Sequence, residues 1–242
     1  MFLPPVLAST QVNAGINLTD GITFLSTFAN TTTRSEAIVV GYNNGSSTGF
    51  TQSRILAIDN PNNNPSFLSG QNTIHSLYTD QTTNSKLLAA TAKVTAGGIT
   101  LYAAGTQGKV LLANYFPTAG PQGLNFPTNW IAYSINYPTN NPIPDVTDIA
   151  VDNNGLALAV LSDGNMLNNF NSSSPAYIQN TATQAKARTI FPGSTSNTYA
   201  FIGAENGNIT MVNLPLTSNP TFILQATFNA LPPLNGVAAK KR

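Results

Sequence analysis

Short apolar runs make up most of the chain, and no stretch shows a sustained helical period. The runs are rich in β-branched and aromatic residues, and clusters of Gly, Asn, Pro and Ser separate them. This pattern is typical of strands joined by tight turns. The longest stretch that permits a helix, Thr181 to Thr189, is short and lies between loop signals. We therefore predict an all-β chain.

One pattern recurs four times along the chain: an apolar strand, a turn containing glycine, and a second apolar strand. The turns are centred on Asn44-Gly45, Gln107-Gly108, Asp163-Gly164 and Asn206-Gly207. Asn-Gly and Asp-Gly favour two-residue hairpin turns, because both central residues must adopt positive φ. The four glycines are 63, 56 and 43 residues apart. These spacings are near the ~40–50 residues of a propeller blade with loop insertions.

Further strands are expected around these hairpins. An apolar strand precedes each hairpin, at 21–25, 73–78, 146–151 and 187–191. An aromatic-rich strand follows most of them, as at 130–137 and 221–228. Each repeat unit therefore has about four strands, the number in a propeller blade.

Residues 148–165, DIAVDNNGLALAVLSDGN, resemble a blade of the YVTN/NHL-like β-propellers. In those blades an inner strand ends in Asp-x-x-Gly and a second strand ends in a glycine turn, and Asp152 to Gly155 and Gly164 occupy these places here. The other three units match only in the hairpin. The resemblance implies a β-propeller of four to five blades, with 9–242 as a single domain and the two chain ends completing a fifth blade. A β-sandwich is the alternative interpretation.

Charged residues are scarce. Asp, Glu, Lys and Arg make up 8% of the 242 residues and leave a net charge of +1, whereas roughly a quarter of residues are charged in ordinary soluble domains. Such a chain has no long-range field that would attract nucleic acid. It has no cysteine, which excludes disulfides and thiolate zinc sites. No run reaches the ~18–20 apolar residues of a membrane helix.

The N-terminal residues 1–8, MFLPPVLA, end in Val6-Leu7-Ala8, where small residues are spaced as in an export cleavage site. These residues are either the remnant of a signal peptide or an ordinary apolar strand. A neutral surface of Asn, Thr and Ser also suits an extracellular setting. We therefore expect an exported protein, placed in the periplasm, at the cell surface or outside the cell.

No residue pattern predicts catalysis. Gly45 to Gly49 has the G-x-S-x-G spacing, and Asp59 and His75 follow in hydrolase order. That motif requires a strand-to-helix turn, whereas this copy lies in a hairpin loop. His75 is the only histidine and lies in an apolar strand. We predict no catalytic residue and no cofactor.

The only acidic cluster contains Asp145, Asp148 and Asp152. Oxygen-rich loops can bind calcium, but the spacing is not that of an EF-hand loop. Asx residues before glycine are also expected in turns. We predict no metal site.

The best candidate for recognition is the aromatic segment from Tyr115 to Pro144. Its proposed binding residues are Phe126, Trp130, Tyr133 and Tyr137. In a strand over 130–137, Tyr133 and Tyr137 share a face with Ile131 and Ile135, and Trp130 lies on the other face. These aromatics either form a binding edge or cover the core between blades. Aromatic groups with amide neighbours suit a protein contact or a sugar.

We therefore expect a non-enzymatic exported domain that acts as a binding module or scaffold in a cell-envelope or surface assembly. Its partner would be a protein. The alternative is a lectin that binds carbohydrate in pockets between blades.

Overall fold

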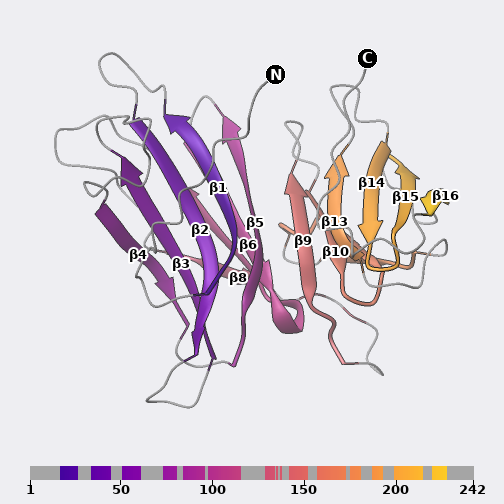
Figure 1. The fold of residues 1–242 in the computed structure, drawn as a ribbon, viewed down its shortest axis with the longest axis horizontal. Coiled ribbons are helices and arrows are strands. Elements are labelled where there is room, and N and C mark those ends of the chain that lie inside the picture. Colours follow the sequence, from indigo (N-terminus) through magenta and orange to yellow (C-terminus); the bar gives the residue numbers. More distant parts are fainter. Residues whose placement is uncertain are drawn as a thin grey trace.

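The computed structural model describes 17–26, 34–44, 51–60, 73–80, 84–95, 98–115, 129–133, 135, 137, 142–151, 157–172, 175–180, 187–192, 199–214 and 220–227. Its strands form four antiparallel sheets of four strands each, and every sheet takes its strands in chain order (Figure 1). The prediction of an all-β chain is confirmed.

The first two sheets contain β1 to β8. The first sheet contains β1 (Asn17–Ser26), β2 (Arg34–Asn44), β3 (Thr51–Asn60) and β4 (Thr73–Thr79). The second contains β5 (Leu87–Thr95), β6 (Gly98–Gly105), β7 (Val110–Tyr115) and β8 (Ile131–Tyr133), with a short 3-10 turn at Thr106–Gly108 between β6 and β7.

The third and fourth sheets repeat this arrangement. The third contains β9 (Val146–Val151), β10 (Ala157–Leu161), β11 (Met166–Asn168) and β12 (Ala176–Ile178). The fourth contains β13 (Ala187–Pro192), β14 (Tyr199–Ala204), β15 (Asn208–Asn213) and β16 (Phe222–Thr227). The last three of the four predicted hairpins are β6–β7, β10–β11 and β14–β15. The first predicted hairpin corresponds to β2–β3, and its turn lies outside the described residues.

The hairpin turns differ in detail. Between β6 and β7, Gln107 (φ 58°) and Gly108 (φ 68°) both have positive φ, as the two-residue turn predicts. In the next two hairpins only Gly164 (φ 91°) and Gly207 (φ 78°) do so. These are three-residue loops that end in a left-handed glycine. The two-residue prediction is wrong there, because a side-chain oxygen fixes the turn instead: Asp163 Oδ1 accepts a 3.0 Å hydrogen bond from the Asn165 backbone N–H.

The strand at 73–78 belongs to the first sheet. The sequence pattern placed it before the second hairpin, but β4 pairs with β3, as in Ile58 opposite Ile74. The strand before the second hairpin is β5, which pairs with β6. This prediction is wrong because alternation of apolar residues identifies a strand without identifying its partner. Two strands lie between the first two hairpins, and each joins the sheet nearer to it in the chain.

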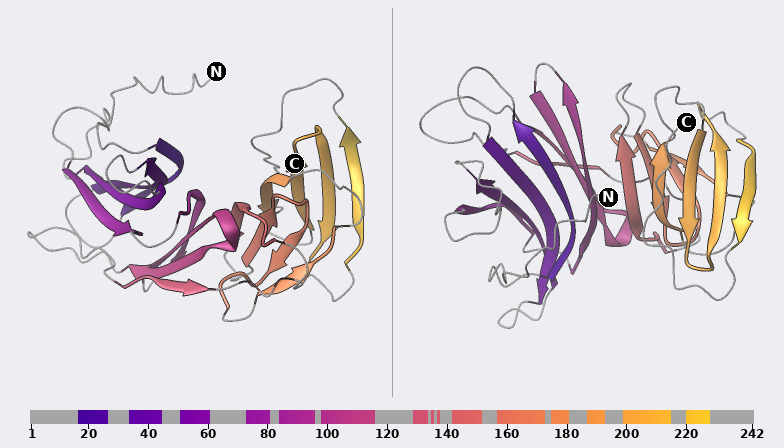
Figure 2. Two further views of the ribbon diagram at one scale, coloured as in Figure 1. Left: turned by 90° about the horizontal axis from the view of Figure 1, so that it is seen from below. Right: turned by 45° about the horizontal axis from the view of Figure 1, so that its top comes forward.

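The sheets pack face to face in chain order along an open arc (Figure 2). The first strands of successive sheets contact each other: β1 contacts β5, β5 contacts β9, and β9 contacts β13. Each sheet alternates its side chains between two faces. Three buried apolar clusters, which we name the first, second and third junctions, therefore lie between successive sheets.

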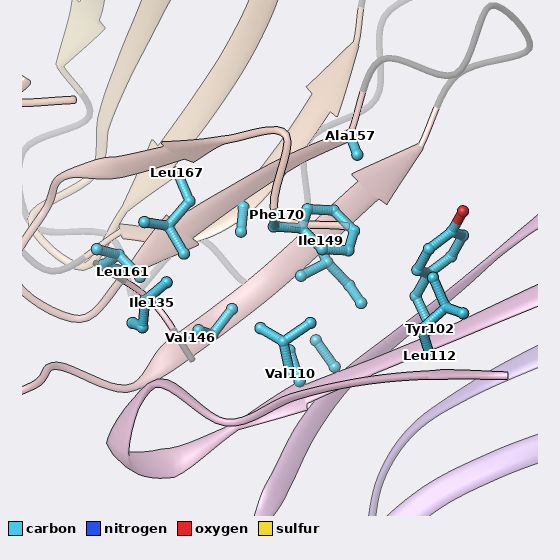
Figure 3. Packing of buried hydrophobic residues seen from close by; sticks show 13 residues of the cluster. Tyr102, Val110, Leu112, Ile135, Val146, Ile149, Ala157, Leu161, Leu167 and Phe170 are labelled. Carbon is cyan, nitrogen blue, oxygen red and sulfur yellow. The ribbon is translucent and has the colours of Figure 1, made fainter. Parts of the chain in front are cut away.

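The first junction lies between the first and second sheets, and its members are Ile38, Val40, Ile55, Ala57, Leu87, Ile99, Leu101, Ala103 and Leu111. The second junction lies between the second and third sheets (Figure 3), and its members are Ala89, Tyr102, Ala104, Val110, Leu112, Ile135, Val146, Ile149, Ala157, Ala159, Leu161, Leu167 and Phe170. The third junction lies between the third and fourth sheets, and its members are Ala150, Leu158, Val160, Met166, Ile178, Ala200, Ile202, Val212, Leu214 and Phe222.

The second junction has an aromatic centre. The rings of Tyr102 on β6 and Phe170 after β11 meet edge to face, with centroids 5.5 Å apart and an interplanar angle of 86°. Phe170 is fully buried. Burial of one such side chain contributes about 1.5–3 kcal/mol. The junctions therefore hold the sheets in their order along the arc.

Candidate recognition edge at the second sheet

The predicted recognition segment forms the outer edge of the second sheet. Its strand, β8, covers only Ile131 to Tyr133, where 130–137 was expected. Ile131 pairs with Leu112 and Tyr133 with Val110 of β7. Phe126, the first of the predicted binding residues, lies outside the described residues.

Trp130 connects this edge to the first sheet. Its indole Nε1–H donates a 3.2 Å hydrogen bond to the carbonyl oxygen of Leu77 on β4. Its ring meets Tyr78 edge to face, with centroids 5.9 Å apart, and it packs against the first junction. The side chain is half-buried. Trp130 thus fixes the start of β8 against β4, and it is not displayed at the edge as a free aromatic surface.

Tyr133 and Tyr137 lie on the opposite side of the sheet. Both are half-buried and pack against the second junction, which includes the buried Ile135. The separation of these residues from Trp130 follows the predicted alternation. Ile131 also follows it, because it pairs with Leu112 as Tyr133 pairs with Val110, but its side chain is exposed.

Tyr137 forms a polar contact with the third sheet. Its hydroxyl donates a 2.7 Å hydrogen bond to Asp163 Oδ2 in the β10–β11 turn. Its ring meets Tyr177 of β12 edge to face, with centroids 5.1 Å apart. Burial, followed by the hydrogen bond and negative charge of Asp163, raises the pKa of Tyr137 far above its ordinary value. The hydroxyl therefore stays protonated as a donor and joins the second and third sheets.

Two exposed apolar side chains, Ile131 and Ile143, lie at or near this edge. Among the described residues, the large apolar side chains that are exposed are Ile131 at 51%, Ile143 at 46%, Ile223 at 42% and Leu224 at 47%. Ile131 is on β8. Ile143 lies beside the β6–β7 turn, where an added Cβ on Gly108 would come within 2.5 Å of its Cγ2. Sequence reasoning missed Ile143, whose position between Pro142 and Pro144 was the available signal.

A partly buried ion pair lies between the first two sheets. Lys109 Nζ pairs with the carboxylate of Asp80 and donates a 3.1 Å hydrogen bond to Ser85 Oγ. Ser85 Oγ is also 2.9 Å from Ser53 Oγ on β3. Ser53 is on β3 of the first sheet and Lys109 directly precedes β7 of the second, so the network connects the two sheets.

Two members of the acidic cluster accept hydrogen bonds from backbone N–H groups. Asp145 Oδ1 accepts a 3.0 Å hydrogen bond from the Gln107 backbone N–H, and Asp148 Oδ1 accepts one of 2.8 Å from the Ile149 N–H. Asp152 lies outside the described residues. In the part of the chain that the structure describes, no three His, Cys, Asp or Glu side chains are grouped to bind a metal. No described helix is long and apolar enough to cross a membrane.

Comparison with known proteins does not define a family. No family model and no curated protein matches the chain. One similar solved structure is the Nup170 N-terminal domain–Nup53 complex of Chaetomium thermophilum, with 15% identity, a TM-score of 0.47, and coverage of 84% of this chain and 28% of that chain. Another is Chaetomium thermophilum polycomb repressive complex 2, with 9% identity, a TM-score of 0.49, and coverage of 92% and 41%. The chain spans less than half of either matched chain.

Proposed function

We propose that the chain is a single β-propeller-type domain in which the four sheets are blades. Three features support this. Each sheet is a four-stranded antiparallel meander, the first strands of successive sheets are neighbours, and the sheets pack face to face in chain order. A β-sandwich would divide its strands between two layers, so the arrangement of four separate sheets favours the propeller.

We further propose that this domain is a non-enzymatic binding or scaffold module that docks a protein partner at β8. The observation that carries the proposal is Ile131, an exposed apolar residue in the middle of an anchored segment. Trp130 is held by Leu77, and Tyr133 packs against the second junction. A side chain presented on a fixed backbone loses little conformational freedom on binding, and its desolvation favours association.

The composition supports a partner outside the cytoplasm. Only 8% of residues are charged, with a net charge of +1, so association would depend on close apolar and hydrogen-bonding contact instead of electrostatic steering. We propose that the domain is exported and works in a cell-envelope or surface assembly. A neutral surface of this kind is insensitive to changes in pH and salt.

The alternative, a lectin, has one observation in its favour. Tyr137, Tyr177, Asp163 and Asn165 lie together between the second and third sheets, and they combine the aromatic and amide groups that bind sugars. Their polar atoms contact one another, however: Asn165 Nδ2 donates a 2.8 Å hydrogen bond to Asp163 Oδ2, which also accepts from Tyr137. A sugar would have to displace these bonds, so a protein partner is favoured.

The test is a pull-down from the native envelope fraction with wild-type protein, Ile131→Asp and Ile223→Asp, run beside a glycan array. Ile131 and Ile223 are similarly exposed but lie on β8 and β16, so the second variant controls for loss of any surface isoleucine. The proposal predicts a protein that wild type and Ile223→Asp retain, and Ile131→Asp loses. With the purified partner, Ile131→Asp should weaken binding at least tenfold, which is about 1.4 kcal/mol.

Two results would contradict the proposal. If Ile131→Asp and Ile223→Asp capture the protein partner equally, the partner binds elsewhere on the surface. Sugar binding without a protein partner would support the lectin. Trp130→Phe serves as a further control, because it removes the hydrogen bond to Leu77 while it keeps an aromatic ring, and it should weaken binding less than Ile131→Asp.

A further inference from the structure

The outer edges of the four sheets differ in how they are protected. A sheet edge has free backbone N–H and C=O groups that can pair with another strand, and proteins usually shorten or cover such edges. Here β8 and β12 have only three residues each. The edge strand β4 has seven, but the Trp130 indole occupies the Leu77 carbonyl. Three of the four edges are therefore short or partly covered.

The edge strand of the fourth sheet, β16, is longer than β8 and β12 and no described side chain covers it, although its ladder with β15 has a bulge at Gln225. It is six residues long, it lies at the outer margin in both views of Figure 2, where it is yellow, and its only described partner is β15. Its sequence, FILQAT, has no charge and no proline. Ile223 and Leu224 are exposed, and Phe222 is buried in the third junction.

The outer face of the same sheet is also apolar. Tyr199 and Phe201 on β14 are half-buried and meet edge to face with centroids 5.3 Å apart. Met211 lies opposite Phe201 on one side and Ile223 on the other, in the ladder of β14, β15 and β16. These four side chains belong to none of the three junctions. An apolar face and an apolar edge thus meet at Ile223.

We propose that β16 is a self-association edge, where it pairs antiparallel with β16 of a second copy about a two-fold axis. The absence of charge on β16 is the reason for choosing a second copy. A two-fold axis places identical residues opposite or near one another, and like charges in such positions are destabilising. The net charge of +1 adds little repulsion between copies.

The pairing register follows from the alternation of side chains. Directly opposed residues of two antiparallel strands point to the same face, so a two-fold axis normal to the sheet must pass through a residue position. The ladder between β15 and β16 shifts register between Leu224 and Ala226, so the first regular part of β16 ends at Leu224. With the axis at Ile223, the two Ile223 side chains lie opposite each other and each Phe222 lies opposite Leu224. The two fourth sheets then form one continuous sheet of eight strands. Because each copy uses its own β16 edge in this contact, no free β16 edge remains and the assembly closes as a dimer.

Light scattering coupled to size exclusion, over a range of protein concentrations, tests the proposal. Wild-type protein should reach twice the 25.4 kDa chain mass as concentration rises. Ile223→Lys and Ile223→Glu should each remain monomeric, because each places like charges across the axis. An equimolar mixture of the two should restore the dimer, because a lysine then faces a glutamate. Circular dichroism checks that the exposed substitutions leave the fold intact.

Ile131→Lys is the matched control, since Ile131 is similarly exposed but lies on β8, and it should dimerise like wild type. The proposal is overturned by a monomeric wild type at every concentration, by open-ended oligomers, or by failure of the mixed variants to pair. It is also overturned if Ile131→Lys dissociates the dimer to the same extent. Partner capture at β8 is measured separately, so either proposal can fail without the other.

Discussion

Strands β10 and β16 are both short and apolar, yet they have opposite environments. All five residues of β10, ALAVL, are fully buried, because β10 is an interior strand of a sheet that is packed on both faces. Leu158 and Val160 face the third junction, and its alanines and Leu161 face the second. In β16, FILQAT, only Phe222 is buried. Apolar sequence therefore identifies a strand, and its place in the arc determines whether it is buried.

The largest expected effect is a loss of stability when a buried side chain of β10 is truncated. Leu158→Ala should destabilise the protein by about 2–5 kcal/mol, because it leaves a cavity in the third junction. Leu224→Ala, the same substitution on β16, should cost less than about 0.5 kcal/mol, as is usual at the surface. Urea unfolding of both variants, at a dilution where the protein is monomeric, measures the difference.

Equal costs at the two positions would contradict the comparison. A large cost at Leu224 would mean that the side chain is buried in the monomer. A small cost at Leu158 would mean that the third and fourth sheets do not pack as described.

A smaller effect is expected at the β6–β7 turn, which adjoins both the second junction and the exposed Ile143. Gly108 has positive φ, and an added Cβ would lie 2.3 Å from Ile135 Cδ1 and 2.5 Å from Ile143 Cγ2. Gly108→Ala should therefore cost about 1–3 kcal/mol through overpacking, with the unfavourable φ adding to it.

The variant Gly108→Ala/Ile143→Ala separates the two causes. Because Ile143 is exposed, its truncation alone should have little effect on the free energy of unfolding. In the double variant it should recover part of the cost of Gly108→Ala, since one of the two contacts is removed. No recovery would show that backbone conformation accounts for the whole effect.

Much of this architecture could be predicted from the sequence. The repeated strand–turn–strand pattern located three hairpins within a few residues, because Gly108, Gly164 and Gly207 are needed at positive φ. The sheet to which β4 belongs could not be predicted, because its apolar alternation does not depend on which neighbour it pairs with. The turn type at Asp163 depended on a side-chain hydrogen bond that competes with the two-residue geometry.

The candidate site was less predictable than the fold. The alternation of side chains correctly placed Trp130 on one face of the segment and Tyr133 and Tyr137 on the other, but it did not show which residues either face contacts. The indole N–H of Trp130 donates its hydrogen bond to the Leu77 carbonyl, which is 53 residues away in sequence. Only the packing of the first and second sheets brings these two groups together. The exposure of Ile131 depends on β8 being an edge strand of three residues, which a local pattern cannot show.

The smallest expected effect concerns the tyrosine contact between the second and third sheets. The pKa of Tyr137 is raised in the folded state by burial and by Asp163, so the folded protein retains a proton that the unfolded chain loses at about pH 10. This stabilisation is complete below that pH and is lost as the pH rises toward the folded pKa. Burial also raises the pKa values of Tyr102 and Tyr177, so tyrosinate absorbance should show Tyr137 within a group of tyrosines that titrates late.

Asp163→Asn should lower the pKa of Tyr137 toward its ordinary value, because it removes the negative charge while it keeps an oxygen acceptor. Burial is the larger cause of the shift, so part of the shift should remain. An unchanged titration would show that Asp163 does not influence the hydroxyl.

Hydrogen exchange of the backbone amides, compared strand by strand between wild type and Ile223→Lys at a concentration where wild type is dimeric, tests the central claim most directly. The account predicts that β10 is equally protected in both proteins and that β16 is protected in wild type and exchanges rapidly in the variant. Rapid exchange of β16 in wild type, or a loss of protection in the variant that extends equally to β8 or β10, would contradict the proposal that β16 pairs with a second copy.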